Sequence, residues 1–196
     1  MAYIDTIPEE QATGAVAAMY DADRELGGYL RNFAKAFSAA PDIYAAWVQL
    51  NSAIKARMDL RRYELATIAA ARRLRSTYCA HAHGSVLLDQ FLDADTLRAA
   101  MEDHHQAGLD PVEVAVMDYA DKIADDATCV TKADVEQLRA HGLTDAEIVD
   151  VVLAAAVRCF FSTVLDGLGI EADARYAQLD ADLREVLTVG RPIAER

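Results

Sequence analysis

The segment from Ser76 to His83 holds the residues of this chain that are best suited to chemistry. It reads Ser-Thr-Tyr-Cys-Ala-His-Ala-His, carries the sulfur of Cys79, and lies at the start of a predicted helix. A cysteine in a first turn faces unpaired backbone N–H groups and the positive end of the helix dipole, and both favour the thiolate. Three basic residues just before it add to this effect: Arg72, Arg73 and Arg75. We therefore expect a reactive sulfur at position 79.

Helical spacing places two polar side chains on the same face as Cys79. Ser76 precedes it by three residues, so its hydroxyl is expected to hydrogen-bond the sulfur. His83 follows it by four residues and lies within plausible reach for proton exchange. Glu64 belongs to the preceding predicted helix, and an antiparallel hairpin would bring its carboxylate back towards this group. These residue types are those of a thiol nucleophile beside a proton-transfer group.

A metal site is an alternative for the same residues, since cysteine, histidine and glutamate all bind zinc. His81 and His83 are two residues apart, however, which places them on different faces of a helix. No other cluster of ligands lies nearby in the sequence, so we expect neither a metal nor a cofactor. The other two cysteines, Cys129 and Cys159, are expected to be inert.

The elements that must position these residues are helices. Apolar residues recur at helical spacing along most of the chain, no strand pattern competes, and glycine and proline are sparse, with 9 and 4 copies. Capping boxes are expected where Thr131 is followed by Asp134 and where Thr144 is followed by Glu147. The predicted helices cover residues 8–25, 41–54, 60–74, 76–91, 93–105, 111–124, 131–141, 144–168 and 171–187. We expect one all-α domain over 1–196 that ends in a loose tail at 190–196.

An internal repeat is predicted at an offset of 83 residues. Leu60-Arg-Arg-Tyr-Glu corresponds to Leu143-Thr-Asp-Ala-Glu, and the apolar positions that follow stay in register. Two helical hairpins of one design, at about 60–92 and 143–175, would explain the correspondence.

Composition and charge exclude several classes of protein. The chain has 196 residues, of which 53% are apolar, so it is neither disordered nor too short for a sizeable core. A net charge of −13 disfavours binding to nucleic acid. The start shows no signal-peptide pattern, and three cysteines suit a reducing compartment, so we expect a cytoplasmic protein. No membrane-spanning segment is expected, because charged residues interrupt the most apolar stretch: Asp145, Glu147, Asp150 and Arg158.

At these residues the chain resembles the alkylhydroperoxidase D-like (carboxymuconolactone decarboxylase) family, whose active-site pattern is Glu-x11-Cys-x-x-Cys-x-x-x-His. Here Glu64, Cys79 and His83 fall in register, and Ser76 occupies the position of the first cysteine. The block from Leu143 to Glu171 is similar to the longer, peroxidase-related branch of the family. The resemblance covers roughly residues 8–180 and implies an alkylhydroperoxidase D-like helical bundle.

The resemblance also implies roles for these residues. Cys79 corresponds to the cysteine that attacks the peroxide, His83 to the proton-relay histidine, and Glu64 to the carboxylate that supports the relay. Ser76 stands where the partner cysteine closes the disulfide, so the usual two-cysteine cycle has no local partner. Another thiol must then resolve an oxidised Cys79: Cys129, Cys159, a cysteine of another subunit, or a small-molecule thiol.

Three functions remain open at this stage. The first is a thiol-dependent peroxidase that acts on a hydroperoxide with a thiol reductant. The second is an acid–base enzyme acting on a small organic acid or lactone, in which Glu64 and His83 move protons and Cys79 only lines the pocket. The third is a helical binding or oligomerisation scaffold without catalysis, favoured by the serine at position 76. The family resemblance further implies a homo-oligomer, namely a dimer, trimer or hexamer.

Overall fold

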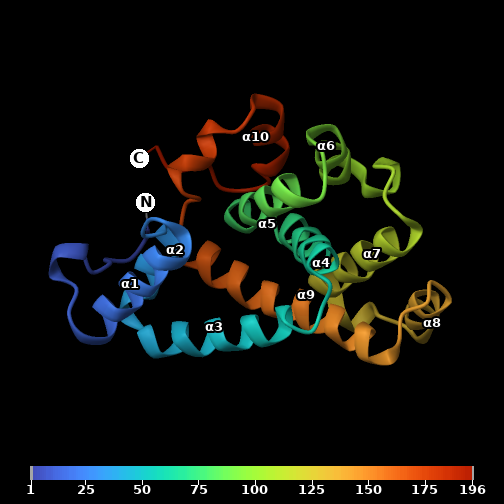
Figure 1. The fold of residues 1–196 in the computed structure, drawn as a ribbon, viewed down its shortest axis with the longest axis horizontal. Helices are drawn as coiled ribbons and strands as arrows, with labels where there is room; N and C mark the ends of the chain where they lie inside the picture. The colour runs from blue at the N-terminus through green and yellow to red at the C-terminus, as the bar shows by residue number, and fades with distance from the viewer. Residues whose placement is uncertain (1, 196) are drawn as a thin grey trace.

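The structure, a computed structural model, describes residues 2–195 and is built from helices, with one isolated bridge between Ala172 and Ile193 (Figure 1). The α-helices of the described residues are α1 (Gly14–Gly27), α2 (Asn32–Ala36), α3 (Pro41–Lys55), α4 (Leu60–Arg73), α5 (Thr77–Gln90), α6 (Ala94–Asp103), α7 (Pro111–Asp126), α8 (Lys132–Ala140), α9 (Asp145–Gly167) and α10 (Ala181–Leu187). The predicted all-α class is confirmed.

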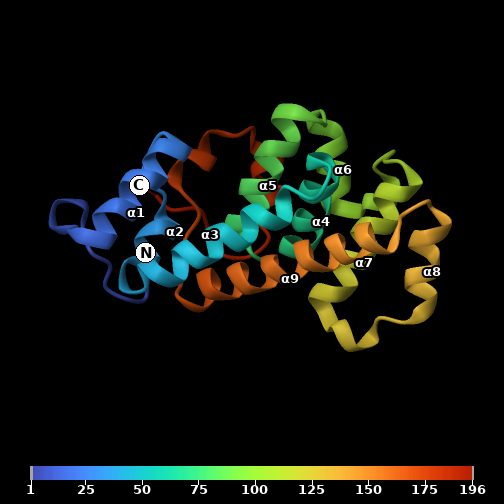
Figure 2. The ribbon, with the colours of Figure 1, turned by 60° about the horizontal axis from the view of Figure 1, so that its bottom comes forward.

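Helix α4 lies at the centre of the bundle and packs against α5, α7 and α9. Every residue from Tyr63 to Ala71 is buried, so α4 is covered on all sides over more than two turns. The alanines of this run, at positions 66 and 69–71, let the neighbouring helices approach closely. Figures 1 and 2 show α3 running alongside α9 on one side of this core.

Helix α9 is the longest element and passes through the core. By length and composition it could cross a membrane, yet 56% of its most apolar window is buried inside the fold. It also carries two buried charged residues, Asp150 and Arg158. A helix that is apolar on several faces is what the centre of a helical bundle requires. We therefore interpret α9 as a core helix of the bundle.

The predicted helix ends are largely confirmed. Both expected capping boxes form, at Thr131 and at Thr144, and they start α8 and α9. Gly108 and Gly142 adopt positive φ values of 70° and 92°, which glycine tolerates best. Local side-chain chemistry therefore sets these boundaries.

Two predicted helices differ from the structure. The segment 8–25 does not start at Pro8, because a 3₁₀ turn at Glu9–Gln11 comes first and α1 begins at Gly14. The segment 171–187 is not one helix but a 3₁₀ turn at Ala174–Gln178 followed by α10. Asp180 caps α10 and breaks the run, and α2 was not predicted.

The predicted repeat of hairpins is only half present. Helices α4 and α5 form the first hairpin, and Arg75, at a φ of 56°, lies at the turn between them. Its counterpart at the offset of 83, Arg158, lies inside the continuous helix α9. The second unit is therefore a single helix followed by irregular chain, because no residue of α9 leaves the helical conformation where Arg75 does.

The predicted loose tail is wrong for the described residues 190–195. The Gly190 N–H donates to Thr77 Oγ1 at 2.9 Å, and the Ala194 N–H donates to the Ala172 carbonyl at 2.8 Å. A Cβ atom at Gly190 would lie 1.9 Å from the carbonyl oxygen of Arg75, so only glycine fits there. The tail is thus attached to the start of α5.

Candidate functional site

Cys79 lies in the first turn of α5, as predicted, and its side chain is buried. It is 1% exposed and belongs to a cluster of aromatic and aliphatic residues that includes Phe33, Tyr78 and Phe161. The backbone N–H groups of this turn have no helical partners, so the helix start presents a positive electrostatic environment to the sulfur.

The predicted pairing of Glu64 with His83 is present in the structure. Glu64 Oε2 on α4 and His83 Nδ1 on α5 are 2.5 Å apart, and both residues are buried. Thr67, one turn after Glu64, places its hydroxyl 3.1 Å from the same nitrogen. This hydroxyl is also 2.7 Å from the Tyr63 carbonyl, to which it donates. The ring is thus fixed through Nδ1, which leaves Nε2 as the nitrogen that can exchange a proton.

Lys55 forms an ion pair with the carboxylate of Glu64. Its ammonium lies 3.0 Å from Glu64 Oε1, so each carboxylate oxygen has a partner. Burial raises the pKa of Glu64, but His83 and Lys55 outweigh it and the net pKa is lowered. The carboxylate is therefore ionised at neutral pH.

The histidine is held neutral. Burial lowers the pKa of His83, the positive charge of Arg158 lowers it further, and the opposing influence of Glu64 does not compensate. A neutral imidazole with Nδ1–H directed at a carboxylate can accept a proton at Nε2 and release it again. The pair can therefore act as a proton relay.

The Cys79 sulfur has a polar partner in Arg158, which comes from α9. Arg158 Nη1 lies 3.4 Å from Sγ, and the arginine is only 4% exposed. Its guanidinium also lies 5.6 Å from the ring of Phe161. The sulfur thus faces a buried cation as well as its helix start.

Ser76 differs from its expected role. It is the N-cap residue of α5 and is fully buried, but it makes no hydrogen bond to the sulfur within residues 2–195. Its hydroxyl lies instead near the carboxylate of Asp166 on α9. The three-residue spacing places Ser76 and Cys79 on one face, but the N-cap position directs the serine towards α9.

The two remaining cysteines are unpaired. Cys129 is exposed, and its thiol donates to Asp126 at 3.3 Å. Cys159 is partly buried, and burial raises the pKa of its thiol. Both environments favour the protonated form, so neither residue has the surroundings of a reactive thiol.

Sequence reasoning missed Arg158, Lys55 and Thr67 as members of the site. Arg158 is a charged residue within the most apolar stretch of the chain, and such an isolated charge is the signal that could have identified it. Lys55 lies in a basic segment with nothing to distinguish it. Thr67 follows Glu64 by three residues, but a threonine in a helix is too common to carry information.

A hydrogen-bond network fixes the start of α5 next to Cys79. Asp173 is buried and accepts hydrogen bonds from the hydroxyls of Tyr78 and Tyr29 and from the N–H of Asn32. Burial, followed by the charge of Asp173, raises the pKa of Tyr78 well above its usual value, so the phenol stays protonated. The network joins α2, α5 and the segment after α9, and it holds the turn that carries the sulfur.

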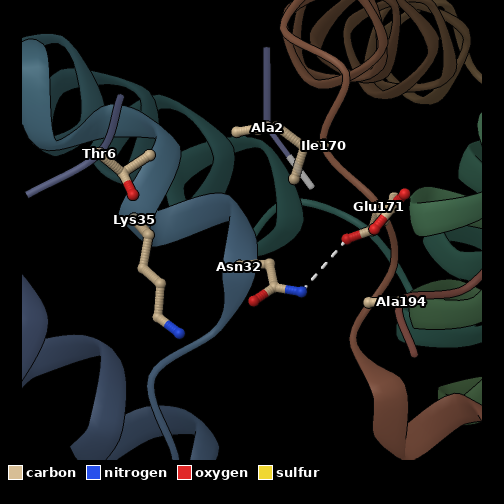
Figure 3. A pocket seen from close by; sticks show the side chains of 7 residues that line it. All are labelled: Ala2, Thr6, Asn32, Lys35, Ile170, Glu171 and Ala194. Carbon is tan, nitrogen blue, oxygen red and sulfur yellow. Dashed lines mark hydrogen bonds between the residues drawn. The ribbon is translucent and has the colours of Figure 1, made fainter. Parts of the chain in front are cut away.

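A small polar cavity of about 150 Å³ lies between α2 and the ends of the chain (Figure 3). Asn32 Nδ2 crosses one side of it to the Glu171 carbonyl at 3.4 Å, and the ammonium of Lys35 points away from Glu171 (Figure 3). Its remaining lining residues are Ala2, Thr6, Ile170 and Ala194. None of the predicted site residues lines this cavity.

An apolar pocket of about 390 Å³ opens on the outer side of α3 and α9. Its lining includes Trp47, Ile54 and Val157, and the last two directly precede Lys55 and Arg158 in sequence. The pocket thus lies beside the helix segments that carry the two cations of the site. Its size is in the range of small-molecule sites.

The two histidines of the predicted metal alternative do not converge. His81 Nε2 lies 3.2 Å from Thr188 Oγ1, and its ring stacks on Tyr176 at 5.1 Å. His83 Nδ1 is directed at Glu64 instead. The different faces predicted from their spacing explain this divergence.

A second histidine cluster lies at the end of α6. Asp103, His104 and His105 approach one another, and His104 Nε2 lies 2.8 Å from Asp118. Arg72 Nη2 lies 3.1 Å from His104 Nδ1. Because arginine only donates, Nδ1 accepts and Nε2 carries the proton, so neither nitrogen offers a free lone pair to a metal.

Protonation of His81 is expected to destabilise the fold. Burial lowers the pKa of this fully buried histidine from 6.5 to about 4. Because the unfolded chain binds the proton more tightly, stability present above pH 6.5 is lost as the pH falls towards 4. Between pH 7 and pH 4.5 this loss amounts to about 2 kcal/mol.

Urea unfolding at both pH values checks this expectation. The free energy of unfolding of a His81→Gln variant should fall by about 2 kcal/mol less than that of the wild type over this interval. The matched control is His141→Gln, since His141 is exposed at the end of α8. An equal pH dependence in wild type and His81→Gln would contradict the burial argument.

Comparisons with known proteins agree with this architecture. Residues 41–122, which contain Glu64, Cys79 and His83, match the Carboxymuconolactone decarboxylase family. No curated protein sequence matches the chain.

Solved structures share the fold at low sequence identity. An uncharacterized peroxidase-related protein from Ralstonia eutropha, described as an alkylhydroperoxidase AhpD core, is 18% identical over 97% of this chain and 98% of its own, with a TM-score of 0.79. An uncharacterized peroxidase-related protein from Silicibacter sp. is 20% identical over 89% and 91%, with a TM-score of 0.76. A cysteine-to-alanine variant of the debrominase Bmp8, in complex with 2,3,4-tribromopyrrole, is 14% identical over 95% and 98%, with a TM-score of 0.73.

The family match covers α3 to most of α7, the segment that supplies the thiol, the imidazole and the carboxylate of the site. The structural likeness extends over nearly the whole chain. Residues 41–122 are thus similar to the carboxymuconolactone decarboxylase family, and the chain as a whole has the helical fold seen in the alkylhydroperoxidase AhpD core structure.

Proposed function

We propose that the protein is a thiol-dependent, peroxidase-like oxidoreductase in which Cys79 reduces a hydroperoxide. The observation that carries the proposal is the buried Glu64–His83 pair, whose atoms are 2.5 Å apart, with Cys79 one helical turn before the histidine. An isolated structural cysteine requires no such relay. A nucleophilic thiolate does, because its attack produces an oxyanion that must gain a proton.

The proposed reaction begins with attack of the Cys79 thiolate on the terminal oxygen of the hydroperoxide. The O–O bond breaks, the sulfur is oxidised to a sulfenic acid, and the leaving alkoxide carries away the electron pair. The neutral His83 takes the proton of the hydroperoxide and delivers it to that alkoxide, which leaves as an alcohol. A further proton from solvent converts the resulting sulfenate of Cys79 to the sulfenic acid. Glu64 stabilises the imidazolium during the transfer.

Return of the oxidised Cys79 to its thiol form requires a thiol from outside the local site. With Ser76 at the position of the partner cysteine, the sulfenic acid condenses with a thiol reductant to a mixed disulfide and water. A second thiol then releases Cys79 and leaves as the disulfide of the reductant. The raised pKa of Cys159 supports an external thiol over this internal candidate.

The surroundings of Cys79 support an organic substrate. Aromatic side chains of Phe33, Tyr78 and Phe161 belong to the same cluster as the sulfur, which favours an apolar group over hydrogen peroxide. The similar Ralstonia and Silicibacter proteins are described as peroxidase-related, which supports peroxide chemistry in general. The debrominase shows that this fold also serves other reactions.

The test is the fate of Cys79 in the presence of a hydroperoxide. The protein is treated with one equivalent of an organic hydroperoxide together with dimedone, which traps sulfenic acids, and is then read by intact mass and peptide mapping. One adduct is expected, on the peptide that carries Cys79, and none without the hydroperoxide. Cys129 and Cys159 serve as internal controls. Adducts confined to those two residues would defeat the proposal.

An acid–base enzyme on a small organic acid or lactone is the second candidate, and the name of the matching family favours it. The Glu64–His83 pair could then act without the sulfur. A Cys79→Ala variant separates the two candidates, because it leaves an acid–base reaction intact and removes thiol chemistry. A scaffold without catalysis would leave both reactions undetectable.

We further propose a cytoplasmic homo-oligomer, namely a dimer, trimer or hexamer, that binds neither nucleic acid nor membranes. The outer face of α3 and α9 supports assembly, since its large apolar side chains are exposed: Ile43, Leu50, Val149, Leu153 and Phe160. Such a contiguous apolar surface is typical of an interface. The net charge of −13 supports the absence of nucleic acid.

A further inference from the structure

Arg158 is a buried cation without a carboxylate partner among residues 2–195. Its residue is 4% exposed, whereas the half-buried Arg31 and Arg61 form ion pairs with Asp23 and Glu113. Within the described chain, the Nε atom of Arg158 has no hydrogen-bond partner at all. Burying an unpaired guanidinium is costly, so a compensating negative charge is required nearby.

The Cys79 sulfur is the group positioned to supply that charge. It lies 3.4 Å from Arg158 Nη1, at hydrogen-bond distance for sulfur, and both groups are buried. Burial lowers the pKa of Arg158, but Cys79 and Tyr63 outweigh it and the net pKa is raised. In a water-excluded site a cation at this distance favours the anionic form of the sulfur over the neutral thiol.

We propose that Arg158 is a further catalytic residue, which holds Cys79 as a thiolate through its guanidinium and so leaves His83 uncharged for proton transfer. The statement that Arg158 is catalytic rests on the proposed function. The assignment gives three helices separate roles: α9 supplies the charge that stabilises the nucleophile, and α4 and α5 supply the relay. The Glu-x11-Cys-x-x-Cys-x-x-x-His pattern contains no arginine, so the sequence motif alone does not reveal this residue.

The charges of the site support this division. Lys55 and Arg158 contribute two positive charges, and Glu64 contributes one negative charge. A thiolate at Cys79 makes the cluster neutral overall. If the histidine were the counter-ion of the sulfur, three cations would face two anions, and Arg158 itself opposes that state by lowering the pKa of His83.

The test measures the thiolate directly, without any substrate. In a Cys129→Ser/Cys159→Ser background, absorbance at 240 nm is followed from pH 4 to pH 10, with the same chain carrying Cys79→Ser as the blank. We expect the thiolate signal of the wild type to rise at a lower pH than that of the Arg158 variants. Arg158→Gln should raise the midpoint of this signal by at least about 1 pH unit, whereas Arg158→Lys, which keeps the charge, should raise it less than half as far.

Two controls make the result specific. Arg73→Gln removes an arginine from an exposed ion pair with Asp125 and should leave the midpoint unchanged. Far-UV circular dichroism shows whether Arg158→Gln is folded. If that variant does not fold, the wild type and Arg158→Lys decide, since a wild-type midpoint near 8.5, the value of a free cysteine, overturns the proposal.

Other outcomes also decide. A midpoint that stays within about 0.3 pH units in Arg158→Gln, or that shifts only in His83→Gln, would mean that Arg158 does not hold the anion. If the titration behaves as expected but dimedone traps no sulfenic acid, the Arg158 assignment stands and the peroxidase proposal fails. The two proposals therefore fail separately.

Discussion

A Cys79→Ser variant is expected to consume an organic hydroperoxide at no more than about one thousandth of the wild-type rate. The substitution keeps the size of the side chain and its place beside Arg158, so the helix start and the proton relay remain. Serine, however, is almost entirely protonated in this range of pH, and its oxygen forms no stable product equivalent to a sulfenic acid. The rate of hydroperoxide loss, measured with excess thiol reductant, checks the prediction.

The matched controls for this variant are Cys159→Ser and Cys129→Ser. Both residues are free thiols with the protonated form favoured, so each single variant should stay within about twofold of the wild type. Full consumption by Cys79→Ser would rule out thiol chemistry at this site. A loss in Cys159→Ser comparable to that in Cys79→Ser would instead identify Cys159 as a resolving thiol.

Removal of the relay carboxylate is expected to have the second largest effect. Glu64→Gln should lower kcat/KM for the hydroperoxide by about 100-fold, within the range of general acid–base catalysis. The amide can still accept a hydrogen bond from His83 Nδ1, but it carries no charge to stabilise the imidazolium formed in the reaction or to balance Lys55. Steady-state kinetics between pH 6 and pH 9 measure the loss.

Glu147→Gln is the matched control for this prediction, because the repeat pairs Glu147 with Glu64 at the offset of 83. Glu147 closes the capping box of α9 and pairs with Arg62. Glutamine serves equally well in a capping box, so this variant should keep its activity. If Glu64→Gln also remained within about fivefold of the wild type, the relay would have no part in the slow step.

Local features of the sequence predicted most of the fold. Helix starts at Pro41 and Pro111 and the capping boxes at Thr131 and Thr144 depend on neighbouring residues alone, and the structure has them. The break at Asp180 and the attachment of Gly190 were not predicted. The attachment depends on a partner more than one hundred residues away, and no local pattern encodes such a contact.

The residues of the candidate site likewise separate into those that local sequence patterns predict and one that depends on a long-range contact. Cys79 and His83 share one helix, and Glu64 lies on the adjacent one, so a periodic pattern and a hairpin suffice to bring them together. Arg158 reaches the sulfur from α9, 79 residues further along the chain. Its position depends on how α9 packs against α5. The spacing of residues along the sequence does not predict where a side chain points across such a long-range helix contact.

The attached tail has a practical consequence for anyone who prepares this protein. The chain leaves Gly190 against the carbonyl of Arg75 and continues along Ala172, within a few residues of the helix end that carries the sulfur. A purification tag fused after residue 196 would act directly on the attached segment 190–195. A cleavable tag that is removed before any thiol assay keeps the native contact between Gly190 and the start of α5.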